Sequence, residues 1–316
     1  MPLGADQSPL PGCPWSLAGT GVSRSPREVA IDVERGRGAL GARGRRLLPP
    51  VDDPWASGRD LIVAAAGHAP SAMNTRPWRL RSRGRGFDLL LDEVNASRRG
   101  SEAGRQATIA CGAALFNLRL ATMRLGYEPV VTIPAGGDLL ARIEPGARIT
   151  IDPVEAELFD AVDRRRTRRR PFERTFVPAS VRDLLAATVA AEGAELIAVP
   201  PGGSRNGLDR IMAVATRLGT HDPARARGLR ADWPGSRPAT VEVLSTLSDE
   251  PTDWLVAGQA LQRLLLTATR QWVQVRFFTA ALEHSELREE VRHRVTPGRY
   301  PQVVLELGQA SASSEG

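Results

Sequence analysis

Two stretches of the chain carry side chains that could hold a ligand. The first, residues 69–78, places a serine and an asparagine between two prolines: Pro70, Ser71, Asn74 and Pro77. Proline fixes φ and stops a helix, while Ser and Asn side chains can bond to neighbouring backbone groups. The pattern predicts a rigid loop that offers hydrogen-bond donors, although it is also typical of an ordinary turn.

The second stretch is basic. Residues 164–170 hold six arginines, interrupted only by Thr167. The planar guanidinium stays charged and can bind two phosphate oxygens at once. Neighbouring guanidiniums repel one another unless an anion lies between them. The run therefore favours a phosphate-bearing ligand, and a solvated surface or a nucleic-acid contact are the alternatives.

Short elements must position both stretches. We expect a helix capped by Ser57 and stopped by Gly67 before the loop, and a hairpin of residues 78–81 and 87–91 after it. A helix over residues 154–164 leads directly into the arginine run. We expect two strands before this helix in the sequence, at residues 127–133 and 147–151.

Two long helices are predicted, one in each half of the chain. Residues 101–125 carry apolar side chains every three or four positions, and residues 253–271 do the same. The second half also predicts a helix capped by Ser180, a helix over residues 208–218, and the strands 195–199, 241–247 and 303–307. The expected fold is α+β, built from two related halves that meet near residue 153.

These motifs resemble a known family. The PSxxNxxPW loop and the R-R-T-x-R run resemble the flavin-binding nitroreductase superfamily. Residues 253–255, residues 257–263 and Pro301-Gln302 look more narrowly like the actinobacterial Acg family of FMN-binding proteins. The resemblance spans about residues 55–308. It implies a nitroreductase-like fold in which two shortened halves, residues 53–153 and 154–308, form a single-chain pseudo-dimer around the long central helices.

The resemblance also implies a cofactor site. It assigns three residues to one flank of a bound FMN and three to the opposite flank: Arg165, Thr167 and Arg169, then Pro70, Ser71 and Asn74. The implied activity passes hydride from NAD(P)H through FMN to a small-molecule acceptor. The alternative is a silent FMN-storage protein whose site is covered by a lid at residues 202–238.

The chain departs from the family pattern in three places. Arg76 stands where a glutamine is usual, and no basic pair follows Gly308. Gln271-Trp272 replaces a Gly-Leu pair at the end of the second long helix, where we expect the bulky indole to force its neighbours to repack.

Composition excludes several classes of protein. The sequence contains no run of eighteen apolar residues that would indicate a membrane helix, and we find no signal segment in it, so a cytoplasmic location is expected. All 42 basic residues are arginine, and outside one cluster they form no concentrated basic face, so no nucleic-acid partner is expected. The two cysteines and four histidines have no disulfide or metal-ligand spacing. No motif in the sequence marks a catalytic nucleophile or a general acid.

The two ends of the chain lie outside the expected halves. Residues 1–52 are predicted to form a disordered or loosely attached leader, and residues 309–316 a tail.

Overall fold

The computed structural model describes residues 53–92, 102–134, 139–167, 172, 176–220, 233–234 and 239–309. The predicted leader and residues 310–316 of the predicted tail lie outside this range. Within it, no helix is long and apolar enough to cross a membrane.

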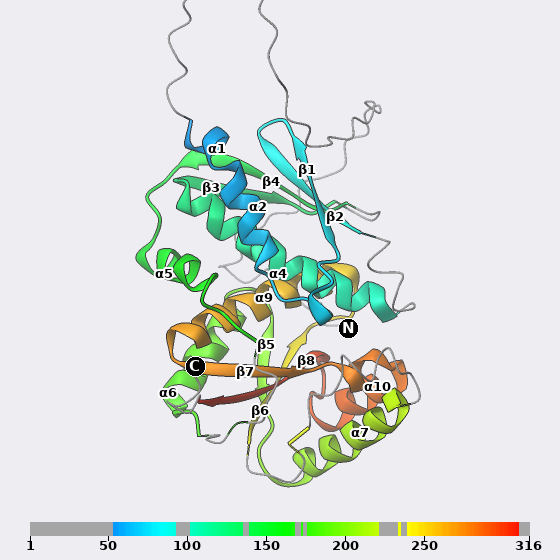
Figure 1. The fold of residues 1–316 in the computed structure, drawn as a ribbon. Coiled ribbons are helices and arrows are strands. Elements are labelled where there is room, and N and C mark those ends of the chain that lie inside the picture. The colour runs from blue at the N-terminus through cyan, green and yellow to red at the C-terminus, as the bar shows by residue number, and fades with distance from the viewer. Residues whose placement is uncertain are drawn as a thin grey trace, which may run out of the picture.

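The first half of the chain forms an antiparallel sheet of four strands in the order β1-β2-β4-β3. The predicted hairpin is confirmed as β1 and β2. Buried side chains of α2 and α4 pack on this sheet in one core, which makes α4 the central helix of the half (Figure 1). The elements of this half are α1 (Pro54–Ser57), α2 (Arg59–Gly67), η1 (Ala72–Asn74), β1 (Trp78–Arg83), β2 (Gly86–Leu91), α4 (Glu102–Arg124), β3 (Tyr127–Thr132) and β4 (Leu139–Arg148).

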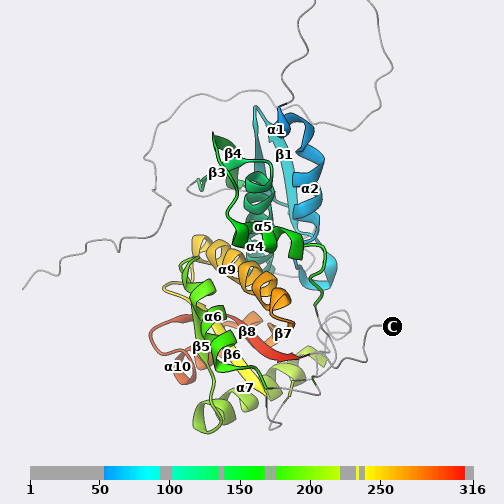
Figure 2. The same cartoon turned by 90° about the vertical axis from the view of Figure 1, so that its left-hand side faces the viewer.

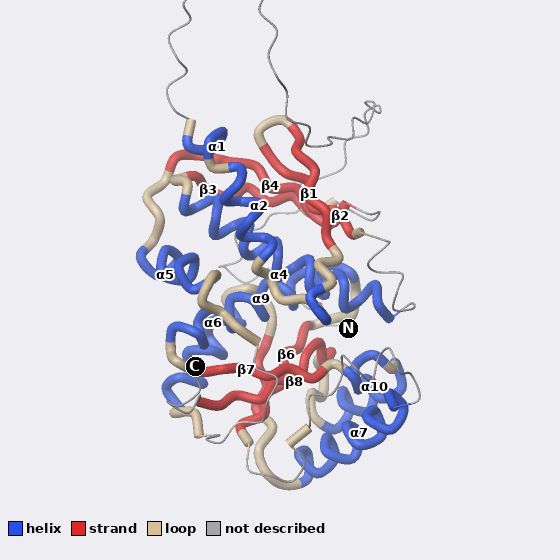
Figure 3. Tube along the Cα trace, in the orientation of Figure 1, coloured by secondary structure: helices blue, strands red, loops and turns tan. Residues whose placement is uncertain are grey.

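The second half forms another antiparallel sheet, in the order β5-β6-β8-β7. One core joins this sheet to α6 and α9, and another joins it to α7, η2 and α10, so helices cover both of its faces (Figure 3). Its elements are α5 (Pro153–Ala161), α6 (Ala179–Ala190), β5 (Glu195–Ala198), α7 (Gly203–Thr220), β6 (Thr240–Thr246), α9 (Pro251–Arg270), β7 (Val273–Phe278), η2 (Ala280–Glu283), α10 (Ser285–Arg294) and β8 (Tyr300–Gln309).

The two halves repeat one strand order. Numbered within its own half, each sheet runs first, second, fourth, third. In each half the long helix, α4 or α9, lies in sequence between the second and third strands. The observed architecture is therefore α+β with two topologically equivalent sheets, as predicted from the long apolar helix and the several strands in each half.

The long helices α4 and α9 cross between the two sheets (Figure 2). A Cβ atom added to Gly258 of α9 would lie 1.9 Å from the carbonyl oxygen of Ile109 and 2.8 Å from the Cα of Gly112. One turn along, Gln262 Nε2 donates to Asn117 Oδ1 at 2.8 Å, and Asn117 Nδ2 donates to the carbonyl of Ala65 at 2.7 Å. Close backbone contact and this buried polar pair fix the register of the crossing.

Several predicted helix boundaries are wrong. The helix expected to be capped by Ser57 and stopped by Gly67 is α2, which ends at Gly67 as predicted but has Gly58 at its N-cap, with no side-chain hydrogen bond. Ser57 is instead the last residue of α1, whose N-cap Asp53 accepts a bond from the Trp55 N–H at 3.1 Å. Helix α6 begins after Pro178, which places Ser180 inside it. Helix α5 ends at Ala161 rather than at residue 164, so the arginine run lies in the loop that follows.

Two strand and loop predictions also fail. The strand expected at residues 147–151 is β4, which begins at Leu139 and ends at Arg148. Trp272 does not force its neighbours to repack, because its residue surface is 78% exposed and its backbone takes a φ of 55°. At the end of a helix this left-handed conformation usually belongs to glycine.

A buried carboxyl on β6 gives a pH-dependent prediction. Glu242 is 4% exposed, and burial raises its pKa to about 7, against a smaller lowering by the charge of Arg182. The folded pKa lies above the unfolded value, so the ionisation penalty is absent below about pH 4.5, grows as the pH rises to 7, and is constant above it. We expect Glu242→Gln to raise the free energy of unfolding by about 3 kcal/mol at pH 8 and to change it little at pH 4.5.

Urea denaturation at the two pH values measures this difference. Glu128→Gln, a change at an exposed glutamate of β3, is the matched control and should have no comparable effect at either pH. A gain from Glu242→Gln that is equal at both pH values would contradict the assignment of the penalty to ionisation.

Candidate functional site

The loop before β1 is closed by its own hydrogen bonds. The Asn74 N–H donates to the Ser71 carbonyl at 3.0 Å, and the Arg76 N–H donates to Ser71 Oγ, also at 3.0 Å. Asn74 and Arg76 both have positive φ, 57° and 47°. Asparagine tolerates this conformation, but a left-handed arginine costs of order 1–3 kcal/mol and persists only where its surroundings impose it. The Ser71 hydroxyl therefore stabilises a strained loop.

The start of the arginine run lies against the beginning of this loop. After α5, the Arg165 N–H still donates to the carbonyl of Ala161 at 2.9 Å. The Arg165 side chain reaches the end of α2. Arg165 Nη2 donates to the carbonyl of His68 at 2.9 Å, and Nη1 donates to Thr167 Oγ1 at 3.0 Å. His68 Nε2 in turn lies 3.4 Å from Asp163 Oδ1. Two contacts therefore join residues 163–167 to His68, the C-cap residue of α2.

Arg165 has an incomplete set of partners. Burial, and then the charge of Arg166, lower its pKa from the usual value. Its Nε is buried and has no hydrogen-bond partner, and no carboxylate of the described residues forms an ion pair with its guanidinium. A buried N–H without an acceptor and a buried cation without an anion are both costly. The site therefore fits a ligand that brings an anionic oxygen.

The structure places five of the six predicted site residues. Arg165 and Thr167 bond to each other, and the His68 carbonyl that Arg165 holds is two positions before Pro70, which is buried. Ser71 is half-buried and its hydroxyl serves the loop itself, while Asn74 is exposed. Within the described ranges, no hydrogen bond joins Ser71 or Asn74 to Arg165 or Thr167. Arg169 lies outside the described residues.

The sequence reasoning missed two participants. His68 and Asp163 link α2 to the loop after α5, yet neither belongs to a motif. His68 was considered only as a metal ligand, and the part of the chain that the structure describes contains no group of three or more side chains suited to a metal ion. The only available signal was position, because His68 follows Gly67, the predicted helix stop.

Two mycobacterial proteins resemble the chain in sequence. No protein-family model matches it. It is 28% identical over 300 residues to the Mycobacterium tuberculosis (strain H37Rv) protein named "Putative NAD(P)H nitroreductase Rv3131", covering 80% of this chain and 86% of that one. It is 27% identical over 298 residues to "Uncharacterized protein Rv3127" of the same organism, covering 78% and 86%.

A solved structure shares the architecture. The crystal structure titled as that of a putative nitroreductase from Anabaena variabilis superposes on 83% of this chain and 90% of its own, with a TM-score of 0.57 and 11% sequence identity. At that identity the likeness concerns the fold, and it extends over most of the chain. The protein therefore has a nitroreductase-like α+β fold.

Proposed function

We propose that the chain is an FMN-binding oxidoreductase of nitroreductase type, which passes hydride from NAD(P)H through FMN to a small-molecule acceptor. The observation that carries the proposal is Arg165, a half-buried cation whose buried Nε–H is unpaired beside the loop at residues 68–76. The fold and the name of the mycobacterial relative support the same reading.

Each residue of the proposed site has a role that its chemistry allows. FMN offers a phosphate, a polar ribityl chain and a flavin ring whose edge becomes anionic on reduction; when bound, the ring accepts and donates the electrons. Arg165 and Arg169 are proposed to bind anionic oxygens, with Thr167 orienting Arg165. On the opposite flank, Pro70 would fix the loop, and Ser71 and Asn74 would donate to the ring or the ribityl chain.

We further propose that the two halves form a single-chain pseudo-dimer of the Acg type. The repeated strand order and the equivalent placement of α4 and α9 support this arrangement. In it, the first half supplies the loop and the second half supplies the arginines, so the flavin would lie between the halves.

The second candidate is an FMN-storage protein with a covered site. The described parts of the proposed lid, residues 202–238, are anchored to the second sheet. Leu208, Ile211 and Met212 of α7 lie in its core, and Trp233 Nε1 donates to Asp209 Oδ1 at 2.8 Å. A lid of this kind would cover the flavin while being fixed at α7. Anaerobic mixing with excess NADPH or NADH separates the candidates, because rapid bleaching of the flavin indicates the enzyme and its absence indicates storage.

The site assignment is tested by Arg165→Ala. We expect the purified protein to be yellow, to release FMN on denaturation, and to lose most of its flavin in the variant, because charge-assisted hydrogen bonds are worth about 1.5–3 kcal/mol, or roughly 10–100-fold in affinity. Absorbance and fluorescence of the bound flavin measure the loss. Arg124→Ala, at the exposed end of α4, is the control. Full flavin in the folded Arg165→Ala variant would contradict the site.

A further inference from the structure

Strand β1 leaves one edge of the first sheet open. It lies at the end of the order β1-β2-β4-β3, and β2 is its only strand partner among the described residues (Figure 1). The Asp92 N–H donates to the Pro77 carbonyl at 2.9 Å, so in this antiparallel ladder every second residue from Pro77 onward bonds to β2. The backbone groups of the residues between them, Trp78, Leu80 and Ser82, therefore point outward, where a further strand could pair with them.

The two faces of β1 differ in chemistry. Trp78 and Leu80 are half-buried and pack against the core of the first half. Successive side chains of a strand alternate between its faces, and the opposite face of β1 carries three exposed arginines: Arg79, Arg81 and Arg83. A strand added to this edge would place its own side chains about 4.5–5.5 Å from these, measured between Cβ atoms. A stable partner strand must therefore alternate apolar residues with acidic ones.

The arginine face carries more positive than negative charge. The carboxylate of Asp88, which is fully buried, lies 3.1 Å from Arg81, 3.9 Å from Arg83 and 2.7 Å from Arg142 of β4. One carboxylate thus serves three guanidiniums, and within the described ranges no hydrogen bond or ion pair reaches the guanidinium of Arg79. The β1 edge of a second copy is a poor partner, because it would bring arginines opposite arginines.

One segment of the leader has the required alternation. Residues 28–34 read Glu-Val-Ala-Ile-Asp-Val-Glu. In an extended conformation the three β-branched residues lie on one face and the three acids on the other. The two sets are Val29, Ile31 and Val33, and Glu28, Asp32 and Glu34. Valine and isoleucine also favour strands. The segment therefore complements both faces of β1.

The leader joins the described chain beside the open edge. Asp53, the first described residue, pairs with Arg85 in the turn between β1 and β2, at 3.3 Å between Oδ2 and Nη2. Arg59 of α2 donates to Ser82 of β1 itself. Residues 35–52 separate the acidic segment from Asp53, and a chain of that length can span up to roughly 60 Å. A strand of the length of β1 measures about 20 Å, so the segment can reach any position along it.

We propose that residues 28–34 bind along the open edge of β1 as a fifth strand of the first sheet. The acids face the arginines, and the apolar residues extend the core beside Trp78 and Leu80. Because segment and strand belong to one chain, the pairing is intramolecular and does not depend on protein concentration. The added strand closes an edge that other chains could otherwise join. The pairing is independent of the proposed flavin site.

Hydrogen–deuterium exchange of the full chain, resolved to single residues, tests the pairing. The amides of Leu80 and Ser82 point outward and would exchange fast at a free edge, so pairing should slow them about tenfold or more. Ile31→Pro should restore fast exchange at both amides, because proline cannot donate a bond to the ladder. The matched control, Ala18→Pro, lies elsewhere in the leader and should leave both amides slow.

A second variant tests the charges. Replacing both Asp32 and Glu34 by arginine should also restore fast exchange, because arginines would then face the arginines of β1. Three results would overturn the proposal: fast exchange of Leu80 and Ser82 in the unmodified chain, slow exchange that survives Ile31→Pro, or slow exchange that appears only at high protein concentration together with a dimer in size-exclusion chromatography. The second result would mean that another part of the molecule covers the edge, and the third would assign the edge to a second copy.

Discussion

Replacing Gly258 by alanine should destabilise the protein by roughly 3 kcal/mol or more, the upper range for overpacked cores. The added methyl group would lie 1.9 Å from the Ile109 carbonyl oxygen and 2.9 Å from the backbone nitrogen of Ala113. Both are backbone atoms, so no side-chain rotation relieves the clash, and α4 and α9 must separate. Chemical denaturation gives the loss in the free energy of unfolding.

Gly104→Ala is the matched control on the partner helix. A Cβ atom at Gly104 would meet nothing within 4 Å. Alanine favours the helix over glycine by about 1 kcal/mol, so this variant should be equal to or more stable than the parent. If both glycine variants have the same stability, the helices do not cross at Gly258.

Elements with a clear period were predictable. The two long helices were found because apolar side chains recur on one face, and the first hairpin because Gly84 and Gly86 mark its turn. The strand β4 was misplaced because Pro145 and Gly146 resemble a turn. In the structure they lie within the strand, where its register with β3 shifts.

The region between α9 and β8 was not predicted at all. Trp272 takes the left-handed position that glycine normally marks, so the end of the helix carries no sequence signal of a turn. Helix α10 has an almost entirely polar sequence with one buried residue, Val291, and therefore lacks an apolar stripe. Its position depends on tertiary contacts, such as Arg288 Nε donating to Asp249 Oδ2 at 3.1 Å.

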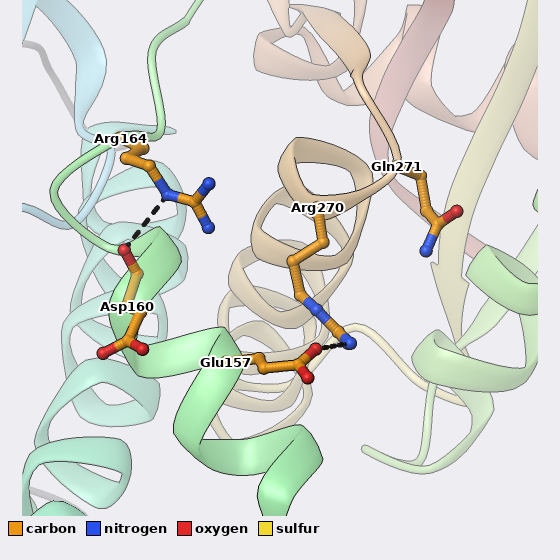
Figure 4. A pocket seen from close by; sticks show the side chains of 5 residues that line it. All are labelled: Glu157, Asp160, Arg164, Arg270 and Gln271. Carbon is orange, nitrogen blue, oxygen red and sulfur yellow. Dashed lines mark hydrogen bonds and ion pairs between the residues drawn. The ribbon is translucent and has the colours of Figure 1, made fainter.

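The candidate site was predictable in type but not in detail. The charge of the arginine run predicted an anionic ligand, and the unpaired Nε of Arg165 agrees with that prediction. Sequence alone could not show that Arg164 donates to the Asp160 carbonyl (Figure 4) while Arg165 donates to the His68 carbonyl, because both residues lie in the loop that follows the end of α5 at Ala161. Nor could the sequence show that the Ser71 hydroxyl accepts a hydrogen bond from the Arg76 N–H.

The junction of the two halves depends on charge as well as on close packing. Glu192, after α6, accepts from Arg119 of α4 at 2.6 Å and from Arg263 of α9 at 3.1 Å. Only 4% of its side chain is exposed. Arg263 also pairs with Glu155 of α5. One carboxylate thus joins helices from both halves. Any movement between the halves must break these ion pairs or move their partners together.

Glu192→Gln should therefore cost about 3 kcal/mol or more. The amide keeps the shape of the side chain but removes the negative charge that faces Arg119 and Arg263, and removing one partner of a buried ion pair typically costs about 3–5 kcal/mol. Thermal and urea denaturation, followed by circular dichroism, measure the loss.

The control is Glu290→Gln, which removes a surface pair. Glu290 and Arg294 lie on exposed α10, with side chains 43% and 54% exposed, so this loss should stay below about 0.5 kcal/mol. Arg119→Met combined with Glu192→Met should recover stability relative to Glu192→Gln, since apolar replacement of a buried ion pair is often neutral. If Glu192→Gln and Glu290→Gln cost the same, the ion pairs of Glu192 do not stabilise the junction.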